Sequence, residues 1–181
     1  MNNNVAENMR SAFGGESQAR MRYQIWGEIA KKDGFPVVET VFNAISYAES
    51  IHAKSHFNVI KDVKGDFEVS SMAGFGIGST SENLKAAADG EKWEVTVMYP
   101  EFLENAESAD EKKAVNSIKW AMAAEQTHEK MYLEAKSFVD QGKDAEFSNI
   151  HICEVCGYAA HGDMLDSCPI CNVKSDKFRI F

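Results

Sequence analysis

The ten residues AESIHAKSHF, at positions 48–57, place a glutamate and two histidines inside a stretch with helical periodicity. Side chains three, four and seven positions apart lie on one side of an α-helix, so Glu49, His52 and His56 share a broad face. Two interpretations compete for this face. It is either a solvated or hydrogen-bonded structural face, or part of a metal site. The rest of the chain decides between them.

The composition is that of a folded, acidic protein. The 181 residues are 44% hydrophobic and 26% charged, enough for one sizeable core and a small second domain. The formal charge of −9 and the lack of any Lys/Arg run argue against nucleic-acid binding. The start MNNNVAENMR lacks the pattern of a secretory signal, and no apolar stretch is long enough to span a membrane. We therefore expect a cytoplasmic protein with neither nucleic acid nor membrane as a partner.

All four cysteines lie near the C-terminus, in the pairs CEVC (153–156) and CPIC (168–171). Two C-x-x-C pairs separated by a short loop are typical of a tetrahedral four-thiolate metal site, and disulfides are disfavoured in a cytoplasmic chain. Zinc and a single iron fit the same ligands, so a structural zinc ribbon and a redox-active iron both stay open. We predict a small metal-binding domain at 148–181, after a larger domain at 1–147.

The larger domain shows helical periodicity in four segments. They run from about Val5 to Lys32, from Pro36 to about Asp62, from the capping residues Ser79–Ser81 to near Tyr99, and from about Ala109 to Gln141. The third is expected to end near Tyr99 because the residue before a proline, here Pro100, disfavours the α conformation. The short turn between the first two helices predicts an antiparallel pair.

Residues 63–80, VKGDFEVSSMAGFGIGST, interrupt the helical pattern and read as a long crossover. The GFGIG within them resembles part of a dinucleotide-binding fingerprint, but no strand precedes it and the third glycine is missing. Two helix pairs joined by a crossover are the plan of a ferritin-like bundle. The predicted fold class is an all-α four-helix ferritin-like bundle followed by a small metal-binding β domain.

The Glu-x-x-His pattern of AESIHAKSHF recurs in AAEQTHEK (123–130), on the fourth predicted helix. Di-metal carboxylate bundles use such a pair from each of two helices and a glutamate from each of the other two. The first and third helices supply the remaining glutamates. The predicted ligands are Glu16, Glu49, His52, Glu91, Glu94, Glu125 and His128.

Several carboxylates on apolar helical faces would cost several kcal/mol of desolvation each, and two divalent cations would offset that cost. Carboxylate and imidazole ligands suit iron or manganese, with zinc left open. Glu16 has the alternative of a first-turn glutamate favoured by a helix dipole, and Glu91 that of a surface residue. Tyr23 lies on the face of Glu16, where it would hydrogen-bond a ligand, pass a proton or only fill the core.

Four further side chains are given lesser roles. Tyr99 has the same alternatives as Tyr23. His56, one turn beyond His52, is expected to support the site or the core rather than bind metal. His151 and His161 lie in the cysteine domain and are expected to face solvent.

Taken together, these stretches resemble the rubrerythrin family over nearly the whole chain. The matching segments are GGESQARMRY (14–23), GFPVVETVFNAISYAESIHAKSHF (34–57), GEKWEVTVMYPEF (90–102), AAEQTHEK (123–130), CEVCGY and CPIC. The resemblance implies a di-iron bundle followed by a rubredoxin-like domain. Two irons would lie in the bundle, and one iron would be bound by Cys153, Cys156, Cys168 and Cys171. One iron would exchange Glu94 for His52 between redox states.

The same resemblance implies a non-haem peroxidase of oxidative stress defence that reduces hydrogen peroxide to water, with electrons relayed through the rubredoxin-like iron. Glu94, His52 and Tyr23 are the expected catalytic residues. No nucleotide site is visible, so a separate NAD(P)H-dependent rubredoxin-type reductase is the expected electron donor. A homodimer is expected, with helix exchange or a larger assembly left open. In the family the cysteine domain often serves a neighbouring subunit.

Two alternatives remain at this point. The first is a ferroxidase or iron-storage bundle. The second is a bundle whose cysteine domain is a structural zinc ribbon that binds partners.

Overall fold

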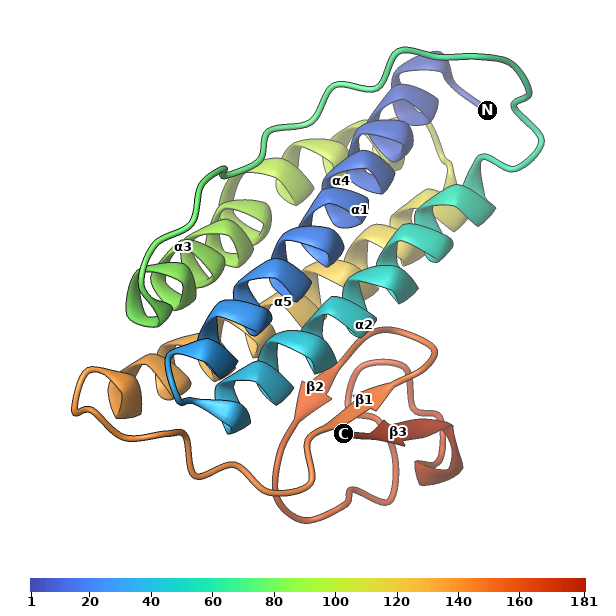
Figure 1. Cartoon of the computed structure of the whole chain (residues 1–181). Helices are drawn as coiled ribbons and strands as arrows, with labels where there is room; N and C mark the ends of the chain where they lie inside the picture. Colours follow the sequence, from blue (N-terminus) through green and yellow to red (C-terminus); the bar gives the residue numbers. More distant parts are fainter.

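A computed structural model describes all 181 residues as a helical bundle with a small strand domain beside α2 and α5 (Figure 1). The bundle helices are α1 (Asn3–Lys32), α2 (Pro36–Val59), α3 (Thr80–Trp93), α4 (Tyr99–Ser108) and α5 (Lys112–Val139). The predicted fold class is therefore confirmed. No helix combines the length and the hydrophobicity that crossing a membrane requires.

Helices α1 and α2 form the predicted antiparallel pair. Asn2 caps α1 by accepting a hydrogen bond from a backbone N–H of the first turn, and Gly34 turns the chain with φ at 91°. Pro36 opens α2, where a missing N–H costs nothing. The carboxylate of Asp144, from the linker to the strand domain, accepts hydrogen bonds from the next two N–H groups of α2. The linker thus fixes the end of the bundle that faces the strand domain.

The prediction that the third helix ends near Tyr99 is wrong. Helix α3 continues into a π-helical segment, η1 (Glu94–Met98), and then into α4. Tyr99 has helical dihedral angles, and its N–H donates to the carbonyl of Glu94. Pro100 has no N–H, and its ring would clash with the preceding turn of a regular α-helix. The wider π turn accommodates the proline, so the helix runs on to Ser108.

The predicted crossover is present. Residues 60–79 contain neither helix nor strand and run along the outside of α1 to the start of α3 (Figure 1). The Trp26 indole N–H donates to the carbonyl of Gly76, and the Ser11 hydroxyl donates to the carbonyl of Ser70. A capping box between Ser79 and Glu82 then starts α3.

The strand domain is a three-stranded antiparallel sheet in the order β2-β1-β3. Its elements are β1 (His151–Cys153), β2 (Ala159–Ala160), the 3₁₀ turn η2 (Ser175–Lys177) and β3 (Phe178–Ile180). The turn after each cysteine pair contains a residue in the left-handed region, Gly157 with φ at 79° and Asn172 with φ at 61°. These turns bring the two C-x-x-C pairs together.

The bundle has two apolar clusters on either side of its centre. The cluster nearer the strand domain contains Tyr23, Phe42 and Tyr132, and it extends to Ile152 of β1. The other surrounds Met9, Tyr99 and Ile118. The buried charged residues of the bundle lie between them.

Candidate metal centres

Six of the seven predicted bundle ligands converge at the centre of the bundle. They come from α1, α2, α3 and α5, and each is at most 2% exposed: Glu16, Glu49, His52, Glu91, Glu125 and His128. An apolar helical face on each element turns these side chains inward, as the periodicity predicted.

The six side chains form two overlapping groups, in each of which the ligand atoms lie within 4.8 Å of one another. One group is Glu16, Glu49, His52 and Glu125, and the other is Glu49, Glu91, Glu125 and His128. Glu49 and Glu125 belong to both groups. This is the arrangement needed for two neighbouring cations bridged by two carboxylates, each with one imidazole and one further carboxylate.

His52 and His128 each point one ring nitrogen at the central carboxylates and the other at a backbone carbonyl of the strand domain. His52 Nδ1 lies 2.7 Å from Glu125, and His128 Nδ1 lies 2.6 Å from the other oxygen of the same carboxylate. His52 Nε2 lies 3.0 Å from the carbonyl oxygen of Cys156, and His128 Nε2 lies 2.9 Å from that of Gly157. Because a carbonyl only accepts, each Nε2 carries the proton, and Nδ1 is left to bind a cation.

The protonation of this cluster is strongly perturbed. Burial raises the pKa of Glu16 and Glu91 well above the usual value, and neighbouring carboxylates raise it further. Burial alone would lower the pKa of His52 and His128, but the carboxylate of Glu125 raises both above the usual value.

Unpaired atoms also mark this cluster as a cation site. The buried oxygens Oε2 of Glu16 and Oε2 of Glu91 have no hydrogen-bond partner. Buried carboxylate oxygens are normally paired, so these two need a ligand. The residues therefore fit a pair of divalent cations.

Glu94 lies outside both groups. It is the first residue of the π segment and is half-buried, and burial, followed by the charge of Glu16, raises its pKa. The structure thus places His52 rather than Glu94 among the central ligand atoms. An exchange between the two remains a prediction.

Two tyrosines hydrogen-bond to Glu16 and Glu91, the two carboxylates that each belong to only one ligand group. The Tyr23 hydroxyl donates to Glu91 at 2.5 Å, and the Tyr99 hydroxyl donates to Glu16. Both rings are buried in the apolar clusters, so each tyrosine fills the core and also orients a carboxylate.

The other histidines differ in part from expectation. His56 is fully buried and contacts Tyr99 and Ser117, as a supporting residue would. The expectation that His151 faces solvent is wrong, because it is buried in β1 against Phe178. All three residues of β1 are buried, and a run of three residues is too short for the sequence to indicate this. His161 is only partly exposed and stacks on Phe147.

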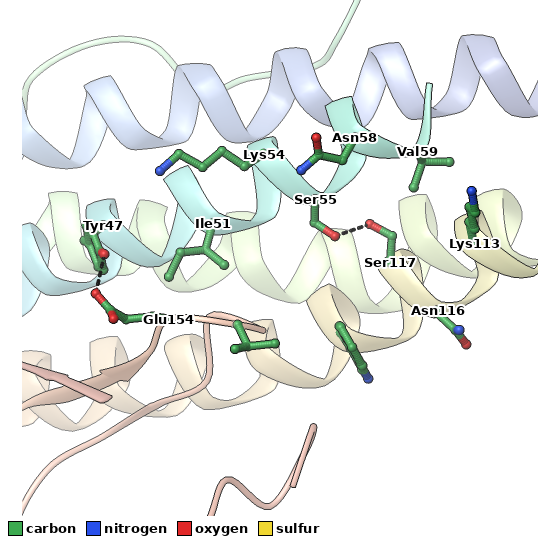
Figure 2. Close-up of a pocket in the computed structure, with 12 residues that line it drawn as sticks. Tyr47, Ile51, Lys54, Ser55, Asn58, Val59, Lys113, Asn116, Ser117 and Glu154 are labelled. Carbon is green, nitrogen blue, oxygen red and sulfur yellow. Dashed lines mark hydrogen bonds between the residues drawn. The ribbon is translucent and has the colours of Figure 1, made fainter. Parts of the chain in front are cut away.

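Ser55 and Ser117 were missed by sequence reasoning. Their hydroxyls lie 2.7 Å apart between α2 and α5, on the wall of a pocket of about 520 Å³ (Figure 2). Ser55 falls within the opening decapeptide, one residue before His56, but a serine at a helix–helix contact carries no distinctive pattern.

The four cysteines form the second centre. Their sulfur atoms lie within 4.8 Å of one another, none is in a disulfide, and Cys156 and Cys168 approach to 3.4 Å. Hydrogen bonding from the Cys156 thiol, assisted by the backbone N–H groups of Val155 and Cys156, lowers the pKa of Cys153 to about 5. Four converging sulfurs with N–H donors nearby suit one tetrahedral metal ion.

This cysteine domain lies against the bundle of its own chain. The Cys156 and Gly157 carbonyls accept from the two central histidines, and the Tyr47 hydroxyl of α2 donates to Glu154 at 2.8 Å (Figure 2). The cysteine turn and the two central histidines of one chain are therefore joined by direct hydrogen bonds.

Comparison with known proteins agrees with both centres. The family model described as Rubrerythrin matches residues 7–136, and that described as Rubrerythrin, rubredoxin-like domain matches residues 151–179. The chain belongs to the rubrerythrin family. As in other rubrerythrins, the bundle holds a carboxylate and histidine di-iron site, and the four cysteines form a rubredoxin-like site.

Individual relatives cover almost all of this rubrerythrin. It is 42% identical to Rubrerythrin-2 of Clostridium acetobutylicum, over 98% of this chain and 96% of that protein. It is 31% identical to Nigerythrin of Nitratidesulfovibrio vulgaris, over 97% and 85% of the two chains. A solved structure of nigerythrin in its fully reduced, all-ferrous state superposes with a TM-score of 0.87 at 30% identity, covering 98% of this chain and 86% of that one.

Proposed function

We propose that this rubrerythrin is a peroxidase that reduces hydrogen peroxide to water at the di-iron site, with electrons arriving through the cysteine-bound iron. The observation that carries the proposal is the pair of hydrogen bonds from His52 and His128 to consecutive carbonyls of the CEVCG turn. A bundle that only stored iron would have no need of a one-electron centre on its two histidines.

The proposed ligands of the two irons are the six central residues, together with Glu94 in the oxidised state. When iron is bound at these residues, it would supply the two electrons that cleave the O–O bond of hydrogen peroxide, which with two protons gives two molecules of water. Tyr23 and Tyr99 orient Glu91 and Glu16, and either hydroxyl is a candidate proton donor.

Partners form a separate part of the proposal. We expect electrons from an NAD(P)H-dependent rubredoxin-type reductase, and a cytoplasmic location fits the four free thiols. We also expect a homodimer, because Met21, Ile25, Phe75 and Ile77 expose apolar side chains together on α1 and the crossover.

Metal content and turnover test the proposal. The purified protein should contain about three irons per chain, absorb visible light through its thiolate–ferric bonds, and oxidise a reductase-coupled NADH supply in proportion to added peroxide. A ferroxidase would instead consume ferrous iron and accumulate it. Zinc in the cysteine site, with no visible absorption, would remove the internal electron route.

A matched variant separates the two centres. Cys171→Ser disrupts the cysteine site at its most exposed ligand and leaves the bundle untouched. It should retain the bundle irons and oxidise once with peroxide, yet lose continuous turnover. Unchanged turnover in this variant would contradict the electron route.

A further inference from the structure

A continuous line of hydrogen bonds leads from Glu16 to the surface. Tyr99 donates to Glu16, and the Tyr99 oxygen lies 3.0 Å from His56 Nε2. His56 Nδ1 lies 2.9 Å from the Ser117 hydroxyl, which lies 2.7 Å from that of Ser55. The chain of contacts therefore crosses from α1 through α4 and α2 to Ser117 on α5, and returns to α2 at Ser55.

The direction of the line follows from which atoms can donate. Tyr99 has one hydroxyl hydrogen and gives it to the carboxylate of Glu16, so its oxygen must accept from His56 Nε2–H. A neutral imidazole then accepts at Nδ1, and Ser117 is its donor. Ser117 in turn accepts from Ser55. Every donor in the line points toward Glu16.

The surroundings keep the line neutral and dry. His56 is fully buried, and its two ring nitrogens face the Tyr99 and Ser117 hydroxyls, so a neutral ring can donate at one nitrogen while accepting at the other. Tyr99 is fully buried, and Ser117 is only 4% exposed. A proton that reaches Glu16 by this path passes from one hydrogen-bonded group to the next.

The outer end of the line opens into the pocket of Figure 2. Ser55 and Ser117 face each other across its inner wall, and Lys54, Asn58 and Lys113 surround them (Figure 2). The pocket is roomy enough for several water molecules and has many polar partners for them. Bulk water thus reaches the first serine.

We propose that Ser55, Ser117, His56 and Tyr99 form a relay that delivers protons from this pocket to the Glu16 side of the di-iron site. The inference rests on the proposed function for its purpose, because each peroxide consumes two protons. In one passage an acid in the pocket gives a proton to Ser55, each group passes one on, and Tyr99 protonates Glu16. His56 exchanges its Nε2–H for an Nδ1–H and stays neutral. Before the next passage the hydroxyls rotate, and the imidazole ring turns so that an N–H faces Tyr99 again.

Proton access can be measured without any redox chemistry. In protein loaded with zinc at all metal sites and labelled with ¹⁵N-histidine, magnetisation exchange with water reports how fast the His56 Nε2 proton is replaced. Ser117→Ala removes the donor to His56 and should slow this exchange about tenfold, because replacement then requires local opening. Ser117→Thr keeps a hydroxyl and should restore the rate.

Ser46→Ala is the matched control. Ser46 is also buried on α2, but its hydroxyl donates to the carbonyl of Arg20 and touches no member of the relay. In Ser46→Ala the His56 Nε2 proton should exchange with water as fast as in the unmodified protein. Unchanged exchange in Ser117→Ala, or equal slowing in Ser46→Ala, would overturn the relay.

A second measurement connects the relay to turnover. After rapid mixing of fully reduced protein with peroxide, Ser117→Ala should oxidise about 10²-fold more slowly, the lower range of positioned proton transfer, and a small acid such as formic acid should recover part of the rate. If peroxide does not oxidise the unmodified protein, the peroxidase proposal fails, and the proton-exchange measurement still tests the relay independently. Normal oxidation with slowed exchange would show that this path does not supply the reaction, and would overturn its assigned role.

Discussion

On one side of the bundle centre Glu91 accepts a hydrogen bond from Tyr23, and on the other side Glu16 accepts one from Tyr99. Beyond Tyr23 lie aromatic rings. The centroid of the Tyr132 ring is 5.3 Å from that of Tyr23, and the Tyr132 hydroxyl has no hydrogen-bond partner. Beyond Tyr99 lies the imidazole of His56 and then the two serines. Two nearly equivalent ligand sets therefore have unlike surroundings, one apolar and one able to conduct protons.

The difference teaches that the ligands alone do not define the chemistry of each iron position. Glu49 and Glu125 are shared, and each side adds one glutamate and one histidine. What differs is the proton supply and the position of the spare ligand, because Glu16 is the neighbouring carboxylate that does most to raise the pKa of Glu94. We therefore expect the predicted exchange of Glu94 for His52 on the Glu16 side, to which His52 belongs.

The largest expected effect comes from removing the histidine on each side. His128→Ala leaves its side with no spare carboxylate, so the protein should bind about one iron fewer per chain. In His52→Ala, the Glu94 carboxylate can take the place of the missing imidazole. This variant should therefore keep its iron while peroxide turnover falls about 10- to 100-fold. Iron analysis and turnover of both variants are the measurements, with the visible spectrum of the cysteine site as an internal control. Equal iron loss in both, or normal turnover in His52→Ala, would contradict the asymmetry.

The next effect concerns the link from both histidines to the cysteine domain. A Cβ on Gly157 would overlap the His52 ring, so Gly157→Ala should push the domain away from the bundle and slow reduction of the di-iron site. Gly162→Ala is the control, because Gly162 also has a positive φ, at 91°, but open space around it. Each variant should lose about 1 kcal/mol of stability from backbone strain.

Rapid-mixing spectroscopy with reduced cysteine-site iron and oxidised di-iron site separates the two variants. Only Gly157→Ala should transfer electrons slowly, and both should keep the spectrum of the cysteine-bound iron. Equal transfer rates would mean that the His52 contact is not on the electron route.

A smaller effect is the pH dependence of the metal-free protein. The raised pKa values of Glu16, Glu91, His52 and His128 mean that the folded state holds protons that the unfolded chain releases. The free energy of unfolding should therefore fall as pH rises above about 6.5. Below that pH, His56 acts in the opposite direction, because its lowered pKa keeps it neutral while the unfolded chain binds a proton.

Urea unfolding between about pH 7 and 9, with and without metal, measures this dependence. Bound cations replace the protons, so the metal-loaded protein should vary much less over the same range. Metal-free protein whose stability increased with pH would show that the carboxylates are not buried as described.

Much of this arrangement could be predicted from the sequence because its signals are local. Glu-x-x-His at helical spacing fixes two donors on one face, and two C-x-x-C pairs fix four sulfurs, whatever the tertiary structure. The same logic placed Glu16 and Glu91, since an apolar helical face is buried and takes its carboxylate with it.

The features that could not be predicted depend on contacts between segments. Pro100 ordinarily limits a helix, and only packing against α5 shows that a π turn is the better solution. Ser55 and Ser117 lie far apart in sequence, and nothing in either segment indicates that their hydroxyls meet. The position of the cysteine domain on its own bundle likewise depends on carbonyls, which every residue has.

The smallest expected effect distinguishes the two tyrosines directly. Tyr23→Phe and Tyr99→Phe each remove one hydrogen bond to a carboxylate, so each should lower the free energy of unfolding by about 1 kcal/mol. Only Tyr99→Phe also cuts the hydrogen-bonded line to the pocket, so only it should change the solvent deuterium isotope effect on oxidation by peroxide. Tyr23→Phe should keep that isotope effect, because no hydrogen bond continues from Tyr23 to a further proton donor: the Tyr132 hydroxyl has no partner, and Phe42 has no polar group. The reverse result would make Tyr23 the proton donor and assign the aromatic side of the site to proton transfer.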